Sequence, residues 1–304
     1  MSNSNPIQQM SNILSQVVED LSYGKVFIQD DYVTINENLA FRNGSLNILG
    51  SRPYVGKTSF SISLARQLAV KRNQPVGFFT CGKNNNKHII RRLIAQEARI
   101  NYNKIGYGTL NKNDVNKIKD TSEKITSCPF YLNDQVLSLH QLTNLIKNMV
   151  NEYGVKLIIV EDCFGLSDIL DYALLWEQQD SSDINEGYRV AISEILDSLK
   201  ATAENLNIPI ILTMHIFRSA SGAWPRISHF KGLASLIKKK SDMIMLLHRE
   251  RPSDDEDYTQ DYFLLIEKSI HGRRDCIRNI FEVPYMRYEL EDTPELAYPL
   301  APNL

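Results

Sequence analysis

The sequence predicts an α/β fold in which helices flank a mostly parallel sheet that ends in an antiparallel C-terminal edge. Three observations lead to this prediction. From residue 45 onward, short apolar segments alternate with segments of helical periodicity, the pattern of βαβ units. The segment Leu157–Val160 is apolar at every position, as expected for a strand that helices cover on both faces. Beyond residue 247, strand patterns follow one another without helices between them, which indicates the antiparallel edge.

The individual elements follow from the same periodicities. The predicted strands are Ser45–Gly50, Val76–Thr80, Lys156–Glu161, Ile208–Met214, Met243–His248, Tyr262–Lys268 and Arg278–Glu282. The predicted helices are Lys57–Arg72, Asn85–Ala98, Asn111–Ser127, Leu139–Tyr153 and Tyr188–Leu206. In the fourth of these helices, Ser138 and Gln141 stand at the spacing of a capping box. Two acidic segments, at 176–186 and 253–257, are predicted to be an exposed loop and a turn.

The clearest functional pattern joins the first of these strands to the first helix. Ser51–Thr58 reads SRPYVGKT and matches the phosphate-binding pattern GxxxxGK[ST] except that Ser51 replaces the first glycine. In such a loop, backbone N–H groups surround an anion, the lysine adds a positive charge and the final hydroxyl reaches Mg²⁺. The sequence therefore predicts a nucleoside triphosphate site formed by Ser51, Arg52, Pro53, Val55, Gly56, Lys57, Thr58 and Ser59.

Two carboxylates that follow Leu157–Val160 are candidates for a metal site. An NTPase needs a carboxylate at the end of a strand beside the phosphate loop, to hold Mg²⁺ directly or through water. Glu161 and Asp162 both meet this requirement, and the pleat of the strand turns only one of them toward the site. We therefore expect Mg²⁺ to be held by Thr58 together with either Glu161 or Asp162.

The composition excludes several classes of protein. A net charge of -2 gives no overall basic field, so contact with DNA would require a local basic patch. The four cysteines are far apart and form no CxxC pair, which favours reduced thiols over a disulfide framework or a zinc site. The polar N-terminus has no apolar signal region, and no apolar segment reaches membrane-spanning length. We expect a cytoplasmic protein without membrane association.

The ends of the chain are predicted to stand apart from a single domain at 25–290. Residues 1–24 contain an amphipathic helix, whose apolar side chains from Met10 to Leu21 recur at helical spacing before Gly24. This helix docks either on its own core or on a neighbouring subunit. Residues 291–304 carry three prolines and are expected to be a loosely ordered tail.

Residues from about 10 to 288 resemble the C-terminal motor domain of the DnaB family of hexameric replicative helicases. The resemblance is carried by Ser51–Thr58, similar to the family's ARPxxGKT, and by Leu157–Glu161, Ser198–Ala201, Leu206–Ile210 and Ser241–Met245. It implies a RecA-like P-loop NTPase core and a homo-oligomer, either a hexamer or a filament. It also makes the N-terminal helix the counterpart of the linker helix that packs on an adjacent subunit. No counterpart of the family's N-terminal primase-interacting domain is expected.

The departures from the family pattern fall on residues that support hydrolysis. Gly82 stands where the family's S-L-E-M motif has the glutamate that activates water, and His215 replaces the glutamine that senses the γ-phosphate. Of the K-x-R pair that reaches the neighbouring subunit's site, Lys268 is kept and Ile270 replaces the arginine. Glu161 takes the position of the metal-binding aspartate. The resemblance thus implies His215 and Lys268 as the remaining catalytic candidates.

These departures affect the predicted rate of ATP hydrolysis more than the predicted binding of nucleotide. An arginine finger contributes about 10³–10⁵ to turnover, and general-base assistance contributes roughly 10²–10⁴. Loss of both would leave a protein that binds nucleotide and hydrolyses it slowly.

The segment Arg218–Lys240 corresponds to the family's loop that lines the central channel and holds single-stranded DNA. Its basic side chains are candidates for the same contact, since binding a nucleic-acid backbone needs positive charge and N–H donors. They are Arg226, Lys231, Lys238, Lys239 and Lys240. An ordinary solvated face would have the same composition. Trp224 and Phe230 are expected to pack in the protein rather than stack on bases.

Two functional hypotheses follow. In the first, a DnaB-helicase-like protein binds ATP and Mg²⁺, engages single-stranded DNA in replication and hydrolyses ATP slowly. In the second, the nucleotide site only stabilises an assembly, and the protein acts as a scaffold, loader or regulator among other replication proteins. A kinase or recombinase on the same fold is a third alternative.

Overall fold

The structure is a computed structural model of the whole chain. It describes residues 31–36, 39–81, 85–163, 166–167, 186–216, 224–230, 232–249, 259–270 and 274–290. The predicted N-terminal helix, the C-terminal tail, the acidic turn and nearly all of the acidic loop lie outside these residues, as do Gly82 and Lys231.

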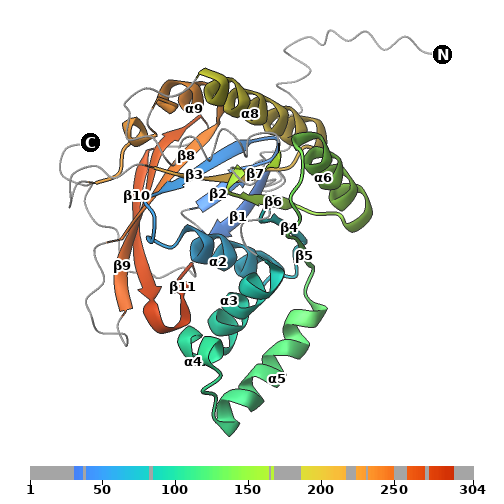
Figure 1. Cartoon of the computed structure of the whole chain (residues 1–304), viewed down its shortest axis with the longest axis vertical. Coiled ribbons are helices and arrows are strands. Elements are labelled where there is room, and N and C mark those ends of the chain that lie inside the picture. The colour runs from blue at the N-terminus through green and yellow to red at the C-terminus, as the bar shows by residue number, and fades with distance from the viewer. Residues whose placement is uncertain are drawn as a thin grey trace, which may run out of the picture.

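The elements alternate along the chain as the sequence predicts (Figure 1). The strands are β1 (Tyr32–Asn36), β2 (Leu39–Arg42), β3 (Leu46–Ser51), β4 (Val76–Phe79), β5 (Phe130–Asn133), β6 (Leu157–Glu161), β7 (Ile210–His215), β8 (Met243–Arg249), β9 (Thr259–Ser269), β10 (Asp275–Glu282) and β11 (Arg287–Tyr288). The helices are α2 (Lys57–Ala69), α3 (Asn86–Ala98), α4 (Tyr102–Tyr107), α5 (Lys112–Ser127), α6 (Leu139–Tyr153), α8 (Glu186–Leu206) and α9 (Ala234–Lys240), with short 3₁₀ turns η3 (Ile227–His229) and η4 (Val283–Tyr285).

One sheet organises the described residues, with the strand order β11-β10-β9-β8-β3-β7-β6-β4-β5. The strands from β8 to β5 run parallel to one another. The strands β9, β10 and β11 add an antiparallel edge. The predicted fold class is therefore confirmed. A separate hairpin of β1 and β2 contributes to the core around α2.

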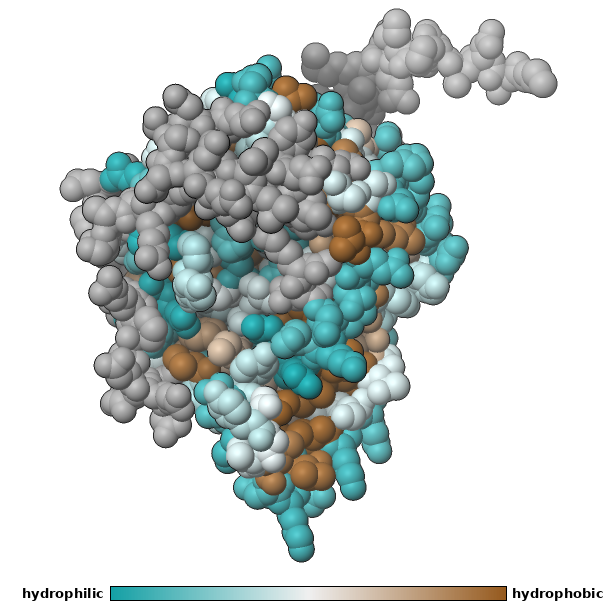
Figure 2. Space-filling view, viewed as in Figure 1, coloured by the Kyte–Doolittle hydropathy of each residue, from teal (hydrophilic) through white to brown (hydrophobic). Residues whose placement is uncertain are grey.

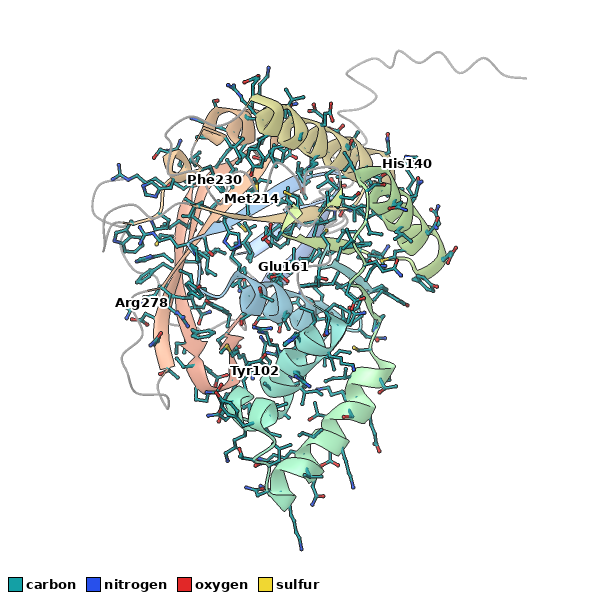
Figure 3. All side chains as sticks on the ribbon, in the orientation of Figure 1. Tyr102, His140, Glu161, Met214, Phe230 and Arg278 are labelled. Atoms are coloured by element: carbon teal, nitrogen blue, oxygen red, sulfur yellow. The ribbon has the colours of Figure 1, made fainter. Side chains whose placement is uncertain are left out.

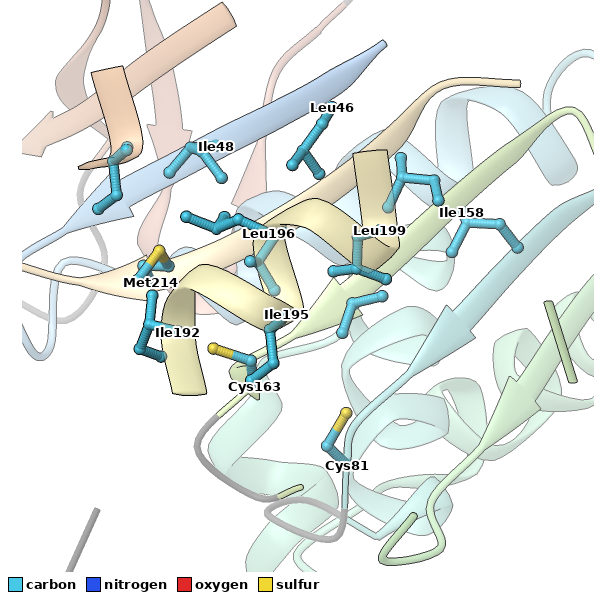
Figure 4. Close-up of a cluster of buried hydrophobic side chains, with 14 of the residues drawn as sticks. Leu46, Ile48, Cys81, Ile158, Cys163, Ile192, Ile195, Leu196, Leu199 and Met214 are labelled. Carbon is cyan, nitrogen blue, oxygen red and sulfur yellow. The ribbon is translucent and has the colours of Figure 1, made fainter. Parts of the chain in front are cut away.

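The continuously apolar strands serve two cores, one on each face of the sheet. Because successive side chains of a strand point to opposite faces, Ile48 joins one core and Leu49 joins the other. The first core includes α6, α8 and α9, and Figure 4 shows Ile192 and Leu196 of α8 beside strand residues of this core. The second core includes α2, α3 and the β1–β2 hairpin. Full burial on both faces explains why β3 and β6 show no polar alternation.

Helices α4 and α5 extend the molecule at its lower end (Figure 1). Apolar side chains are visible there in the space-filling view (Figure 2), and Val115 on α5 is 39% exposed. The helix α5 begins at a capping box made by Asn111 and Asp114. In a capping box, the two polar side chains accept hydrogen bonds from backbone N–H groups that have no partner within the helix.

The structure adds elements that the sequence did not predict. The hairpin β1–β2, β5 and β11 are strands of two to five residues, too short for a clear periodic signal. Within the segment expected to be a loop, residues 234–240 form α9, because Ile237 is buried against the first core. In the part of the chain that the structure describes, no helix combines the length and apolar character needed to cross a bilayer.

Candidate nucleotide-binding site

The phosphate loop joins the end of β3 to the start of α2. Gly56 precedes the first helical residue and has φ 106°, a left-handed conformation that glycine adopts without steric penalty. A Cβ at this position would lie 2.8 Å from the hydroxyl of Tyr288. The first N–H groups of α2 have no partner within the helix, so they point into the space where an anion would bind.

Three side chains from distant segments fix the loop in place. The Tyr288 hydroxyl donates to the Val55 carbonyl oxygen at 2.5 Å. Arg249 Nη2 donates to the Tyr54 carbonyl oxygen at 3.2 Å, and Gln96 Nε2 donates to the Ser59 carbonyl oxygen at 3.1 Å. The loop backbone is thus preorganised by β11, β8 and α3. The Tyr54 side chain itself is 89% exposed.

The strand order brings the predicted site residues to one edge of the sheet. The strand β7 lies between β3 and β6, and it pairs Ser51 with His215 and Glu161 with Thr213. All three strands are parallel, so their carboxyl ends meet beside the phosphate loop. This is the position at which open α/β sheets bind ligands.

Glu161 is buried beside the loop and keeps an oxygen without a protein partner. Its carboxyl group lies beside Thr58 and Lys57, and Figure 3 shows it near the middle of the molecule, beside α2. Burial raises the pKa of Glu161 to about 7, although the Thr58 hydrogen bond and the Lys57 charge act in the opposite direction. Its Oε2 atom is buried without a hydrogen-bond partner.

This donor set fits a magnesium ion. A carboxylate and a hydroxyl are hard oxygen ligands, and Mg²⁺ usually takes one or two carboxylates together with waters and substrate phosphates. Thr58 and Glu161 would supply the protein ligands. The described residues contain no group of three or more His, Cys, Asp or Glu side chains that converge on a metal position, so the remaining ligands would come from phosphates and water.

Asp162 faces a different neighbour. It has φ 60°, a left-handed conformation that aspartate tolerates better than most residues, and its N–H donates to Thr213 Oγ1 at 3.1 Å. Its Oδ2 atom lies 3.2 Å from His215 Nε2. Lys57 Nζ lies 2.9 Å from His215 Nδ1 and 3.5 Å from His215 Nε2.

The remaining predicted site residues lie away from this group. The Lys268 ammonium donates to the Lys238 carbonyl oxygen at 2.7 Å and also to the Ser241 carbonyl oxygen, at the C-terminal end of α9. Lys268 pairs with Ile244 near the start of β8, at the end of the sheet opposite to the phosphate loop. Contact of Lys268 with a neighbouring subunit's site stays a prediction.

The predicted DNA-binding residues lie on and near α9. Lys238 and Lys239 are exposed, whereas Lys240 forms an ion pair with Asp197 of α8. Arg226 is exposed immediately before η3. Trp224 packs against the rings of His248 and Phe263, and Phe230 is buried in the first core, as we expected for these two aromatic residues.

Sequence reasoning missed the side chains that hold the site together. No rule of residue spacing connects position 288 with position 55, so the sequence does not identify Tyr288 as a residue of the site. Two of the segments that carry the family resemblance do meet: Lys200 Nζ lies 2.7 Å from Asp242 Oδ2. That oxygen also accepts from the Leu46 N–H at 2.7 Å. The pair ties α8 to the start of the strand that leads into the phosphate loop.

The sheet, the phosphate loop after β3 and the carboxylate at the end of the parallel strand β6 define a RecA-like P-loop protein. The family model "DnaB-like helicase C terminal domain" matches residues 27–290. The chain belongs to this DnaB-like helicase family.

Solved structures have the same fold. An isolated ATPase domain of known structure aligns with a TM-score of 0.71 at 17% identity, over 93% of this chain and 98% of that one. A DnaB-like replicative helicase described with its interactions with primase aligns with a TM-score of 0.70 at 17% identity, over 94% of this chain and 68% of that one.

Curated relatives are replicative helicases. The chain is 27% identical to the replicative DNA helicase DnaB of Treponema pallidum, over 84% of this chain and 54% of the relative. It is 26% identical to DnaB of Geobacillus stearothermophilus, over 69% of this chain and 44% of the relative. The chain thus spans about half the length of the curated relatives it matches.

Proposed function

We propose that the protein binds ATP and Mg²⁺ as the motor domain of a DnaB-like helicase and acts on single-stranded DNA in replication. The observation that carries this proposal is the position of the phosphate loop and Glu161 at one edge of the sheet, with Thr58 beside the carboxylate. In this arrangement Lys57 and the N–H groups of α2 bind the phosphates, and Thr58 with Glu161 holds the metal.

Hydrolysis is proposed to be slow. Gly82 and Ile270 stand where the family has a water-activating glutamate and an arginine finger. Neither side chain can move a proton or stabilise the charge that develops on the transferred phosphoryl group. The phosphate loop is unaffected by these replacements, so we expect binding to be retained.

Single-stranded DNA and a second copy of the chain are the proposed partners. Lys238 and Lys239 are exposed on α9 and would contact the DNA backbone. The helix expected at residues 10–21 would pack on an adjacent subunit to form a hexamer or a filament. Other replication proteins would bind the assembled form, and the cytoplasm is the proposed location.

A second candidate function is favoured by the same two replacements. A chain that has lost both the glutamate and the arginine would use nucleotide only to stabilise an assembly, and would act as a scaffold, loader or regulator. ATP turnover separates the two candidates.

The test measures ATP turnover of the purified protein, with and without single-stranded DNA, together with its oligomeric state. Lys57→Ala is the negative variant, and Lys119→Ala on the exposed face of α5 is the matched control. Turnover above that of Lys57→Ala, stimulated by DNA and unchanged in Lys119→Ala, supports the motor. Tight ATP binding with turnover equal to that of Lys57→Ala supports the scaffold.

A further inference from the structure

Three side chains, of Lys57, Asp162 and His215, meet at the end of β7. Lys57 Nζ lies 2.9 Å from His215 Nδ1, and His215 Nε2 lies 3.2 Å from Asp162 Oδ2. Asp162 is 4% exposed. The imidazole ring of His215 therefore contacts both the lysine of the phosphate loop and a buried carboxylate.

The Asp162 carboxylate decides which ring nitrogen of His215 carries the hydrogen. The Lys57 ammonium, which has only donors, lies 2.9 Å from Nδ1 and 3.5 Å from Nε2, so it is nearer to Nδ1 but does not alone select the tautomer. A carboxylate has only acceptors, so Nε2 carries the hydrogen and donates it to Asp162. His215 is thereby held as the Nε2–H tautomer, with an acceptor turned toward the phosphate loop.

The backbone conformation at position 162 explains why Asp162, and not Glu161, faces His215. Glu161 ends β6 beside Thr58, and the next residue turns into the left-handed region at φ 60°. The hydrogen bond from the Asp162 N–H to Thr213 Oγ1 fixes this turn against β7. The two adjacent carboxylates thus face different partners. Glu161 faces the Thr58 hydroxyl, and Asp162 faces the His215 imidazole.

We propose that Asp162 is a positioning residue that holds His215 with Nδ1 facing the terminal phosphate, so that His215 orients the attacking water. This inference rests on the proposed binding of ATP at the phosphate loop. When ATP binds, Lys57 moves from His215 to the phosphates. The lone pair on Nδ1 of His215 then has no ammonium partner and faces the site of reaction. A water molecule between that nitrogen and the phosphate donates its hydrogen bond to the same lone pair. The pair takes over the water-orienting task for which Gly82 has no side chain.

The tautomer gives a test that is independent of ATP. Long-range ¹H–¹⁵N NMR of the full chain, with His215 assigned by its loss in His215→Phe, should show the Nε2–H tautomer. In Asp162→Asn, the amide N–H group can donate to Nε2. His215 is then no longer restricted to the Nε2–H tautomer, so a mixture of tautomers should appear. A His215 signal that is the same in the wild type and in Asp162→Asn overturns the positioning role.

The kinetic test separates binding from turnover. In single-turnover measurements, Asp162→Asn and His215→Phe should each lower the hydrolysis rate about 10²-fold, within the range of general-base and water-positioning effects. ATP affinity should stay within about threefold of the wild type or become tighter, because Lys57 is released from His215. A structural role would instead weaken binding and lower the melting temperature.

The outcomes distinguish this inference from the proposed function. Failure of the wild type to bind ATP refutes the proposed function, while the tautomer measurement still tests the Asp162–His215 pair. Normal ATP binding with hydrolysis unchanged in both variants overturns the water-orienting role, as does wild-type turnover equal to that of Lys57→Ala. Should Asp162→Asn fail to fold, the wild-type spectrum still tests the pair, because an Nδ1–H tautomer of His215 overturns the positioning role.

Discussion

The hydroxyl of Tyr288 donates a hydrogen bond to the carbonyl oxygen of Val55, joining the last strand of the sheet to the phosphate loop at 2.5 Å. Burial raises the pKa of Tyr288, so the hydroxyl keeps its hydrogen at every pH near neutrality. Residues 233 positions apart in the chain thus share one contact. The C-terminal edge of the sheet supports the loop directly.

Removing this hydroxyl should weaken both stability and nucleotide binding. We expect Tyr288→Phe to lower the free energy of unfolding by roughly 1–2 kcal/mol, since a buried carbonyl loses its partner. ATP affinity should fall several-fold, because the loop backbone is less well fixed. The matched control is Tyr262→Phe, whose hydroxyl donates to the Glu289 carbonyl oxygen at 2.9 Å. It should lose similar stability and bind ATP as the wild type does. Equal ATP affinities in the two variants would refute the loop-positioning role.

Gly56 should tolerate no side chain. Alanine at φ 106° costs about 1–3 kcal/mol in backbone strain, and its Cβ would lie 2.8 Å from the Tyr288 hydroxyl. We expect Gly56→Ala to abolish ATP binding in titration calorimetry. Gly106→Ala on α4 is the control, because nothing lies within 4 Å of its added Cβ, and it should keep full binding. Wild-type affinity in Gly56→Ala would contradict the loop geometry.

Glu97 is the centre of an ion-pair cluster between α2, α3 and α5. It lies 2.9 Å from Arg66 and 3.5 Å from Lys71, and it also pairs with Lys124. The side chains of Arg66 and Glu97 are 1% and 6% exposed. Glu97→Gln removes the carboxylate that pairs directly with the buried Arg66, so we expect a loss of roughly 3 kcal/mol in the free energy of unfolding. Glu123→Gln, on the exposed face of α5, should change stability little.

The same cluster predicts a pH dependence of stability. Burial alone would raise the pKa of Glu97, but the Lys124 hydrogen bond and the Arg66 and Lys71 charges lower it overall. The unfolded chain then binds more protons than the folded protein, so stability rises with pH through this range. The contribution of Glu97 is present above the ordinary glutamate pKa of about 4.3 and is lost as the pH falls toward the lower folded value. Urea titrations between about pH 3 and pH 6 should show a smaller slope in Glu97→Gln, and an unchanged slope would contradict the assignment.

Cys81 should resist alkylation in the folded protein. Burial raises the pKa of Cys81 to about 12, and the carboxylates of Asp162 and Glu161 act in the same direction. Only the thiolate is nucleophilic, so at about pH 8 this thiol should react far more slowly than an exposed cysteine. Peptide mass spectrometry after iodoacetamide treatment measures the rate, with the urea-unfolded protein as the reference. Equal rates in the folded and unfolded protein would contradict the burial of this strand end.

Local patterns predicted the elements that position the site. The GKT of the phosphate loop, the apolar β6 segment and the helical stripe of α6 each depend on neighbours within a few residues, so periodicity and capping rules identified them. The structure also confirms the antiparallel edge. The choice between Glu161 and Asp162 remained open in the sequence, because it depends on the turn at Asp162 and on contacts with β7.

Long-range contacts account for what sequence reasoning missed. Tyr288, Gln96 and Arg249 are far from the phosphate loop in sequence and are brought near it by the fold, and nothing in their own segments marks them. The ion pair of Lys200 with Asp242 joins residues 42 positions apart. Such pairs are set by the fold as a whole, and a single sequence carries no signal for them.

The central claim is that the phosphate loop binds ATP with Mg²⁺, and calorimetric titration of ATP into the Mg²⁺-loaded solution of the full chain tests it most directly. Binding should also raise the melting temperature, since a ligand that binds only the folded state stabilises it. We expect saturable binding and a raised melting temperature in the wild type and in Lys119→Ala, and neither in Lys57→Ala. Absence of binding in the wild type at millimolar ATP, or equal binding in Lys57→Ala, would contradict the account.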